Sequence, residues 1–336
     1  MPKATVLMPV YNSEKYISEA IESILNQSLE DFEFIIIDDG SNDNTIDIIK
    51  QYLDKRIHLY QNKENIGISN SLNRGLALSG TDIIMRMDAD DVSNSERINK
   101  QYTYLTSHTD CALVSSDVNI LDEKGNTITC DRVNGVHLFY NLIFICPIYH
   151  SSVMFRKSAV QQIGGYTVRY AEDFELWWQL SRRHKIANIP ETLLNYRISS
   201  QSLHLTTRRT EYEQAHLEQM SRNIRYYMGE QFSAPVEHLQ CLRHNFAPLL
   251  AKGSVNSILT CLNTLNSITS QIIAKQEPNM HSHEVMDAAL LKQRFIILFY
   301  ANKLPIFKSI TLLFKLKLFH IIKYKFTNTL LKLLKI

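Results

Sequence analysis

The sequence predicts an α/β protein with a mostly parallel sheet of the kind that carries helices on both faces, followed by a helical, basic extension. Three observations support this prediction. Short apolar runs alternate with segments whose apolar residues recur at helical spacing, repeatedly within the first 90 residues. Residues 34–37 (FIII) form a continuous apolar run, as in a strand buried on both faces. Past residue 230 the chain contains one glycine, Gly253, and its segments are typical of helices.

The elements are expected in a regular order. Strands are predicted at residues 4–10, 32–37, 56–60 and 82–87, with helices between them at 13–26, 45–53 and 69–79. Beyond residue 110 we expect a hairpin at 112–129 with its turn at 123–126, a strand at 151–155, a tight turn at 164–165 and helices at 173–183 and 206–228. We divide the chain into a sheet domain, residues 1–230, and a helical extension, residues 231–336.

The composition is that of a compact protein from a reducing compartment. Of 336 residues, 45% are hydrophobic and 21% are charged, which excludes a disordered or collagen-like chain. The five cysteines lie far apart in sequence and form no Cys-x-x-Cys pair. The first residues run directly into a strand-like pattern, so we expect no export signal and a cytoplasmic protein.

The formal net charge of +2 hides two regions of opposite charge. Residues 1–230 contain 23 lysines and arginines against 30 acids, whereas residues 231–336 contain 13 against 4. The last acid is Asp287, and no later uncharged run reaches the roughly 18 residues of a spanning helix. We therefore expect residues 292–336 to bind an anionic membrane surface at the inner face of the cell membrane, with packing on the protein as the alternative. Nucleic acid is not an expected partner, because no recognition module is present.

Polar side chains follow three of the predicted strands. Tyr11 and Asn12 follow the first strand, Asp38 and Asp39 the second, and residues 88–91 the fourth. Because the carboxyl ends of parallel strands meet at one edge of a sheet, we expect one ligand site there. The sequence contains neither a Gly-x-Gly-x-x-Gly loop after the first strand nor a P-loop, which argues against a dinucleotide-dependent oxidoreductase and a P-loop nucleotidase.

Asp88, Asp90 and Asp91 place three carboxylates within four residues. Hard oxygen ligands so arranged suit one divalent cation, Mn²⁺ or Mg²⁺, and a solvated acidic turn that caps the next helix is the alternative. The pattern also fits the nucleophile loop of haloacid-dehalogenase-like phosphatases. That loop normally follows the first strand of its domain, whereas this one follows the fourth.

A second group of candidate residues lies further along the chain. Glu172 and Asp173 precede an amphipathic helix, whose N-terminus keeps a carboxylate ionised and able to act as a base, with simple capping as the alternative. His150 precedes a strand and is either an acceptor-site group or a structural histidine. Arg197 is either a cation beside a phosphate group or a member of a surface pair.

Together these residues resemble the family 2 glycosyltransferases, which have a GT-A fold, over residues 3 to about 200. The matching segments occur in the family's order. They are residues 8–12 (MPVYN), 35–41 (IIIDDGS), 65–67 (NIG), 72–75 (LNRG), 86–91 (RMDADD), 150–156 (HSSVMFR), 164–166 (GGY) and 171–177 (AEDFELW).

The resemblance implies transfer of a sugar from a nucleoside-diphosphate donor, expected to be a UDP-sugar, with inversion at the anomeric carbon. It assigns nucleotide-sugar binding to five residues: Pro9, Tyr11, Asp39, Asn73 and Asp88. It also assigns Mn²⁺ or Mg²⁺ to Asp90 with Asp88, and the general base to Asp173.

The resemblance leaves the acceptor or phosphate side less defined. Glu172, His150 and Arg197 are its candidates here. Leu72 stands where some members have an arginine, and Ser199 stands where a histidine is often found. Arg74, Arg197 and His204 therefore remain alternatives for neutralising the diphosphate.

The leading hypothesis is an enzyme that transfers a sugar to a hydroxyl of a glycan or lipid-linked acceptor in surface polysaccharide synthesis, such as lipopolysaccharide or capsule. The alternative from another class is a nucleotide-binding, membrane-peripheral protein without turnover. The presence of Asp39, Asp90 and Asp173 together favours the enzyme.

Overall fold

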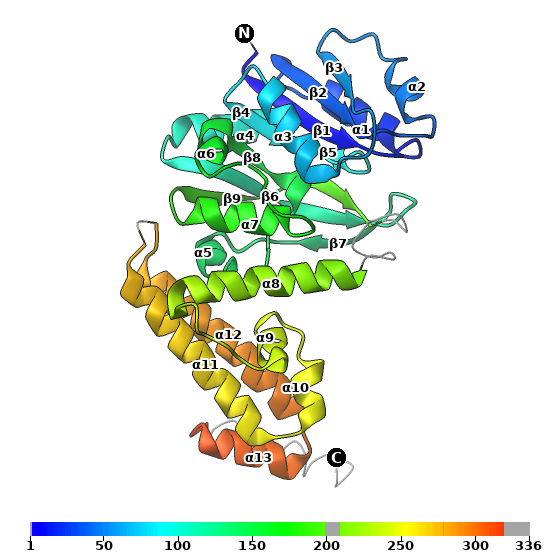
Figure 1. Cartoon of the computed structure of the whole chain (residues 1–336). Helices are drawn as coiled ribbons and strands as arrows, with labels where there is room; N and C mark the ends of the chain where they lie inside the picture. Colours follow the sequence, from blue (N-terminus) through cyan, green and yellow to red (C-terminus); the bar gives the residue numbers. More distant parts are fainter. Residues whose placement is uncertain (1, 199–208, 278, 319–336) are drawn as a thin grey trace. The chain divides into compact units, whose positions relative to one another are not determined.

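Figure 1 shows the chain in a computed structural model, which describes residues 2–198, 209–277 and 279–318. The chain divides into two compact units, which we call the sheet unit (Met1–Gln219 with Glu277–Met280) and the helical unit (Met220–Gln276 with His281–Ile336). This division falls within one long helix, α8 (Arg209–Met228). The domain boundary at residue 230 stays a prediction.

Four parallel strands form the first half of the sheet. β1 (Ala4–Val10) pairs with β2 (Phe32–Asp38) on one side and with β4 (Ile83–Arg86) on the other, and β3 (Ile57–Gln61) pairs with β2. β1, β2 and β4 are buried along almost their whole length. Their apolar runs are covered on both faces, which confirms the predicted fold class.

Helices connect these strands and cover the sheet. They are α1 (Ile17–Leu25), α2 (Thr45–Ile49), α3 (Ile68–Leu78) and α4 (Arg97–Ser107). α1 buries Ile17, Ala20, Ile21 and Ile24 on one face, as their helical spacing predicts. α3 lies so close to β1 that a Cβ atom on Gly75 would collide with the side chain of Leu7.

The second half of the sheet contains antiparallel pairs. The strands are β5 (Val92–Ser93), β6 (Cys111–Leu121), β7 (Thr127–Asp131), β8 (Met154–Arg156) and β9 (Lys185–Arg197). The sheet order is β3-β2-β1-β4-β8-β6-β9-β5, with β7 paired to β6. β6 and β7 form the expected hairpin, and β6 runs without a break from Cys111 to Leu121.

Short helices link these strands and position the second group of candidate residues. They are η1 (Gly135–His137), α5 (Leu138–Asn141), η2 (His150–Ser152), α6 (Lys157–Gln162) and α7 (Glu172–Ser181). The strand predicted at 151–155 is therefore shorter, because its first residues belong to the 3₁₀ turn η2. β9 ends at Arg197, and it runs parallel to β6.

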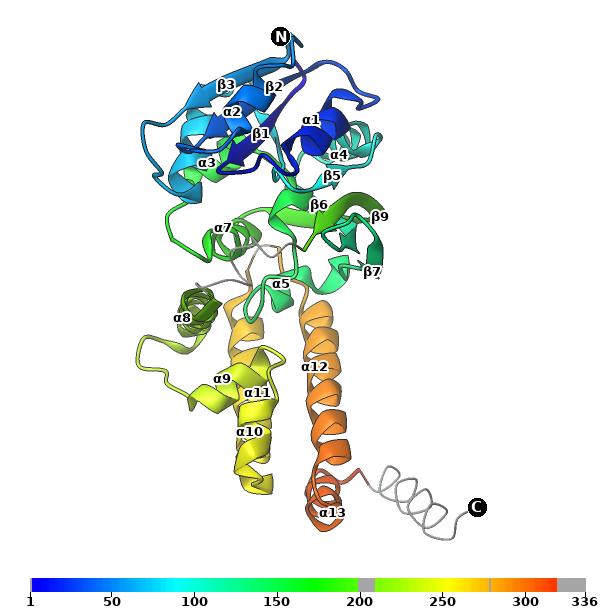
Figure 2. The same ribbon diagram turned by 90° about the vertical axis from the view of Figure 1, so that its right-hand side faces the viewer.

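The helical unit contains α9 (Val236–Leu242), α10 (Ala247–Lys252), α11 (Val255–Lys275), α12 (Ser282–Lys303) and α13 (Ile306–Lys315). α11 and α12 lie side by side, and α13 contacts both (Figure 2). Their shared core is apolar and includes Leu265, Ile296 and Leu312. Within the described residues, no helix combines the length and apolar character needed to cross a bilayer.

Candidate active site

The candidate site is built at the carboxyl edge of the parallel strands. Val10 and Asp38 are paired at the ends of β1 and β2, and the backbone N–H of Asp39 donates to the carbonyl of Val10 at 2.8 Å. Asn12 then joins the two loops, because its N–H donates to Ser41 Oγ and its Oδ1 accepts from the N–H of Asn42, both at 2.9 Å. The first two predicted polar clusters are therefore neighbours in space.

Asp39 is buried and organises the loop that follows β3. Its carboxylate accepts hydrogen bonds from Asn62 Nδ2 at 2.7 Å and from the backbone N–H groups of Ile66 (3.0 Å) and Gly67 (2.9 Å). A carboxylate has about four acceptor positions, so one remains for a ligand. Pro9 lies within β1, and Tyr11 is exposed just beyond it.

Asn73 shapes the glycine turn before α7. Its Nδ2 donates to the carbonyl of Tyr166 at 2.8 Å, and its Oδ1 accepts from the N–H of Tyr166 at 3.0 Å. Gly165 has φ +74° there, and a Cβ at this position would lie 2.6 Å from Asn73 Oδ1. Both polar groups of the Asn73 amide are thus used within the protein.

The acidic turn after β4 divides its three carboxylates between two roles. Asp91 is buried and accepts from the hydroxyl of Ser151 and from the N–H of Arg197. Asp88 is partly exposed and contacts Nη2 of the buried Arg86 at 2.7 Å. Burial and the charge of Asp88 raise the pKa of Asp90 to about 6. Asp91 thus stabilises the turn through its hydrogen bonds, whereas the carboxylates of Asp88 and Asp90 are available to bind a ligand.

The donor set of this turn fits a Mn²⁺ or Mg²⁺ ion shared with a substrate. Among the described residues, no cluster of three or more His, Cys, Asp or Glu side chains is arranged to hold a metal by itself. Mg²⁺ is commonly held by one or two carboxylates, with water and substrate phosphates completing the shell. Burial, followed by the charges of the neighbouring aspartates, raises the pKa values of Asp90 and Asp91, and a bound cation would offset this negative charge.

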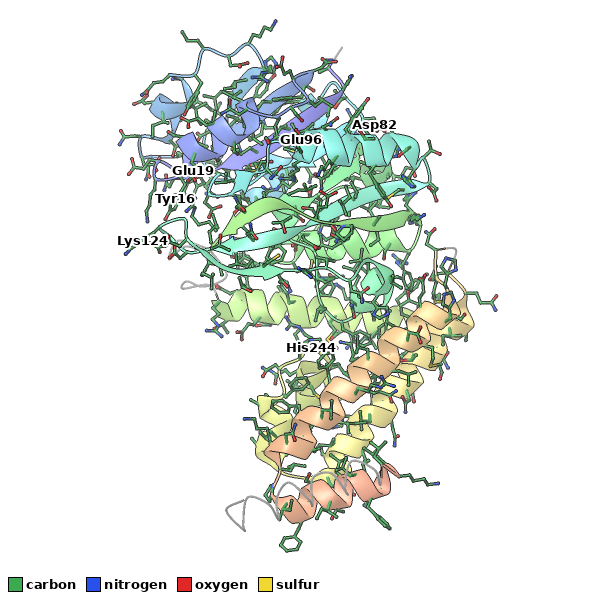
Figure 3. The ribbon with its side chains drawn as sticks, turned by 180° about the vertical axis from the view of Figure 1, so that it is seen from behind. Tyr16, Glu19, Asp82, Glu96, Lys124 and His244 are labelled. Atoms are coloured by element: carbon green, nitrogen blue, oxygen red, sulfur yellow. The ribbon has the colours of Figure 1, made fainter. Side chains whose placement is uncertain are left out.

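Arg197, at the end of β9, is buried and holds the acidic turn in place. Its Nε donates to the carbonyl of Asp90 at 2.9 Å, and its Nη2 lies 2.6 Å from the carboxylate of Glu19 on α1. The guanidinium also stacks on the ring of Tyr16, 4.6 Å from the ring centroid. Tyr16 and Glu19 lie on the same side of the sheet unit (Figure 3). Most of the donors of Arg197 are therefore used within the protein.

Asp173 lies in the first turn of α7. Its Oδ1 accepts from the N–H of Phe174 at 2.7 Å, and its Oδ2 accepts from the thiol of Cys146 at 3.7 Å. Burial raises the pKa of Asp173, and the nearby charge of His216 opposes this shift. A carboxylate with a raised pKa at a helix N-terminus is suited to accept a proton.

The neighbouring Glu172 belongs to a more deeply buried group. Burial and the charge of Asp173 raise the pKa of Glu172 to about 8. His150 Nδ1 lies 3.8 Å from Glu172 Oε1, and His150 Nε2 lies 3.1 Å from the Tyr166 hydroxyl. Burial and the charge of Arg86 lower the pKa of His150, so this imidazole is neutral. The structure thus brings Glu172 and His150 together beside the glycine turn.

Several contributing residues were missed in the sequence. Arg86 contacts Asp88, and its charge also acts on His150 and Glu172, so it influences both polar groups electrostatically. Tyr16 and Glu19 hold Arg197. Arg86 could have been found from the sequence, because it lies two residues before the acidic turn. The contacts of Tyr16 and Glu19 with Arg197 join segments that are far apart in the chain, so no local pattern indicates them. Ser199 and His204 lie outside the described residues.

Two solved GT-A glycosyltransferases share this fold. TarS 1–349 of S. aureus in complex with UDP-GlcNAc has a TM-score of 0.57 at 16% identity, over 90% of this chain and 93% of that chain. The mannosyltransferase PcManGT of Pyrobaculum calidifontis in complex with GDP-Man and Mn²⁺ has a TM-score of 0.53 at 18% identity, over 88% and 87%. The fold is therefore of the GT-A glycosyltransferase class.

Sequence comparisons define the family. The Glycosyl transferase family 2 model matches residues 5–164. An uncharacterised glycosyltransferase of Haemophilus influenzae is 33% identical over 245 residues, covering 68% of this chain and 75% of that protein. The O-antigen biosynthesis glycosyltransferase WbnJ of Escherichia coli is 31% identical over 274 residues, covering 77% and 93%. The chain belongs to glycosyltransferase family 2.

Proposed function

We propose that this glycosyltransferase moves a sugar from a nucleoside-diphosphate donor, a UDP-sugar, to a hydroxyl of a glycan or lipid-linked acceptor in surface polysaccharide synthesis. The names of two relatives support the pathway: WbnJ, and the amylovoran biosynthesis glycosyltransferase AmsE of Erwinia amylovora, which is 31% identical over 206 residues. The observation that carries the chemistry is the acidic turn at the sheet edge. Two of its carboxylates remain for a ligand there, at an edge where sheets of this class bind nucleotides.

On this proposal the chain supplies three functions. Asp39, with the exposed Tyr11 and Pro9 beside it, forms the nucleotide side. Asp88 and Asp90 hold the divalent ion, which supplies Lewis-acid stabilisation of the departing diphosphate when bound. Asp173 accepts the proton of the acceptor hydroxyl as its oxygen bonds to the anomeric carbon and the bond from that carbon to the diphosphate breaks. Attack from the opposite face inverts the anomeric centre.

The protein network orients these groups. Arg197 and Ser151 fix the backbone and side chain of the turn around Asp90. Asn73 fixes the glycine turn that precedes Asp173. Arg74 Nη1 donates to the side chain of Asn62 and to the carbonyl of Gln61 at 2.9 Å, close to the loop held by Asp39. Two of the cations considered for the diphosphate can be compared. Arg74 is less buried than Arg197, so its side chain can more readily leave its protein partners and bind a phosphate group.

Two measurements test this proposal. A thermal melting shift with UDP- and GDP-sugars, each with and without Mn²⁺, should show stabilisation that depends on the metal and is largest for a UDP-sugar. The anomeric configuration of the product, followed by NMR, should be opposite to that of the donor. No shift with any sugar nucleotide, or a product with retained configuration, would contradict the proposal.

We also assign the enzyme to the inner face of the membrane. A lipid-linked acceptor lies at that surface, and the region after Asp287 contains lysines and arginines without acids.

A further inference from the structure

The end of the helical unit presents aromatic and cationic side chains to solvent. Phe307, in the first turn of α13, is 82% exposed, and Phe314 is 62% exposed. They are seven residues apart, so they lie on one face of the helix, with Thr311 between them. The opposite face, Ser309, Leu312 and Leu313, is buried. α13 is thus held by one face, and the opposite face carries the exposed side chain of Phe307.

α13 is held firmly in place. Ser309 Oγ donates to the carbonyl of Ala301 at 2.6 Å, and Lys308 Nζ donates to the carbonyl of Gly253 at 2.8 Å. Lys315 Nζ donates to Asn256 Oδ1 at 2.9 Å. Phe307 is therefore attached to a well-ordered helix, which lowers the conformational cost of inserting its side chain into a partner.

Several exposed lysines lie beside this face. Lys303, Lys308, Lys315 and Lys317 are exposed, and no acid follows Asp287 in the sequence. Each ammonium has three donors, so the bonds of Lys308 and Lys315 leave N–H groups for another partner. Lys292, by contrast, is 3% exposed and donates to the carbonyl of Leu242 at 3.0 Å, so it does not belong to this surface.

We propose that the outward face of α13, with Phe307 as its main anchor and Lys303, Lys308, Lys315 and Lys317 around it, docks on an anionic lipid bilayer. Phenylalanine side chains enter the boundary between headgroups and acyl chains, and lysines beside them pair with lipid phosphates. A second copy of this face fits poorly, because a symmetric contact would bring lysines toward lysines with no acid between them. This extends the membrane contact proposed above and assigns it to particular side chains.

Vesicle binding by the full chain tests this inference without reference to turnover. Vesicles of 30% phosphatidylglycerol in phosphatidylcholine are compared with pure phosphatidylcholine, and bound protein is measured by sedimentation. Phe307→Ser should weaken partitioning about tenfold, since a buried aromatic side chain is lost. Lys303→Gln should weaken it about fivefold, and 0.5 M NaCl should weaken binding of the unchanged protein.

Phe295→Ser is the matched control, because Phe295 is a comparably exposed phenylalanine (56%) on α12 of the same unit. It should leave partitioning nearly unchanged, and circular dichroism melts should show all variants folded. Equal binding by Phe307→Ser and the unchanged protein would overturn the inference, as would an equal loss in Phe295→Ser. A dimer in sedimentation velocity that Phe307→Ser dissociates would assign the face to a second copy instead. Normal transfer to a soluble acceptor by Phe307→Ser would leave the proposed function intact.

Discussion

At the scale of single residues, Glu172 and Asp173 are adjacent carboxyl groups with different expected roles. The pKa of Glu172 is raised to about 8 by burial and by the charge of Asp173, so Glu172 carries its proton at neutral pH. The side chain of Asp173 is less buried than that of Glu172, and its Oδ2 accepts a hydrogen bond from the thiol of Cys146. Asp173 is therefore the member of the pair suited to act as the base.

Replacing Asp173 by asparagine should lower kcat about 10²- to 10⁴-fold while leaving nucleotide affinity unchanged, because the proton acceptor is lost and the donor site is not. Steady-state kinetics and nucleotide titration measure the two effects. Glu172→Gln is the control, since glutamine resembles the neutral carboxyl group already present, and its loss should be much smaller. Full activity in Asp173→Asn would mean that Asp173 only caps α7.

Arg197 should act on the metal through the backbone of Asp90. Arg197→Lys removes the guanidinium hydrogen bonds to Asp90 and Glu19, each of the charge-assisted kind worth roughly 1.5–3 kcal/mol. We expect weaker Mn²⁺ binding in the presence of UDP, by about tenfold or more, as measured by electron paramagnetic resonance. Arg156→Lys is the control, because Arg156 also binds backbone carbonyls but pairs with Ile83 at the opposite end of β4. Unchanged Mn²⁺ affinity in Arg197→Lys would argue against this positioning role.

At the scale of elements, β1, β2 and β4 were predictable because each is a short, mostly apolar run followed by a polar turn. β9 was largely missed, because its 13 residues include Pro190, Glu191 and two asparagines and show no regular alternation. Its identity as a strand depends on pairing with β6, about 75 residues earlier in the chain. The same holds for the site. The acidic turn was visible as a local motif, whereas the hydrogen bonds of Arg197 to Asp90 and of Asn73 to Tyr166 join segments about a hundred residues apart.

The contact of α3 with β1 requires glycine at position 75. Gly75→Ala should lower the free energy of unfolding by about 1–3 kcal/mol, because the added methyl group collides with Leu7 in a closely packed region. Gly80→Ala is the control, since the nearest atom to a Cβ there, Glu33 Oε1, is 3.5 Å away. Urea unfolding measures both. Equal stability of the two variants would show that the helix can move away from the strand.

At the scale of the whole molecule, the acidic sheet unit and the basic helical unit have different chemistry, as the division of charge in the sequence predicts. A truncation after residue 291 would not remove a separate tail from an otherwise intact helical unit. It would delete most of α12 and all of α13, with the buried residues Ile296, Tyr300 and Leu312. Point substitutions are therefore the appropriate test of membrane binding.

The buried Lys292 should give the helical unit a pH dependence. Burial lowers the pKa of Lys292 to about 8, against 10.5 in the unfolded chain. Between these two pH values the unfolded state binds more protons, so the free energy of unfolding should rise with pH. Hydrogen exchange of α12 amides at pH 8 to 10 measures this rise, and Lys292→Met should reduce it. An equal slope in the variant would assign the pH dependence to other groups.

The central claim is that Asp88 and Asp90 hold a divalent ion on which sugar transfer depends. The most direct measurement is the rate of donor turnover in Mn²⁺ and in excess EDTA, for the unchanged protein and for Asp90→Asn. We predict that EDTA abolishes turnover and added Mn²⁺ restores it, whereas Asp90→Asn stays inactive in Mn²⁺ with its fold unchanged by circular dichroism. Turnover that survives complete chelation, or near-normal activity of Asp90→Asn, would contradict the account.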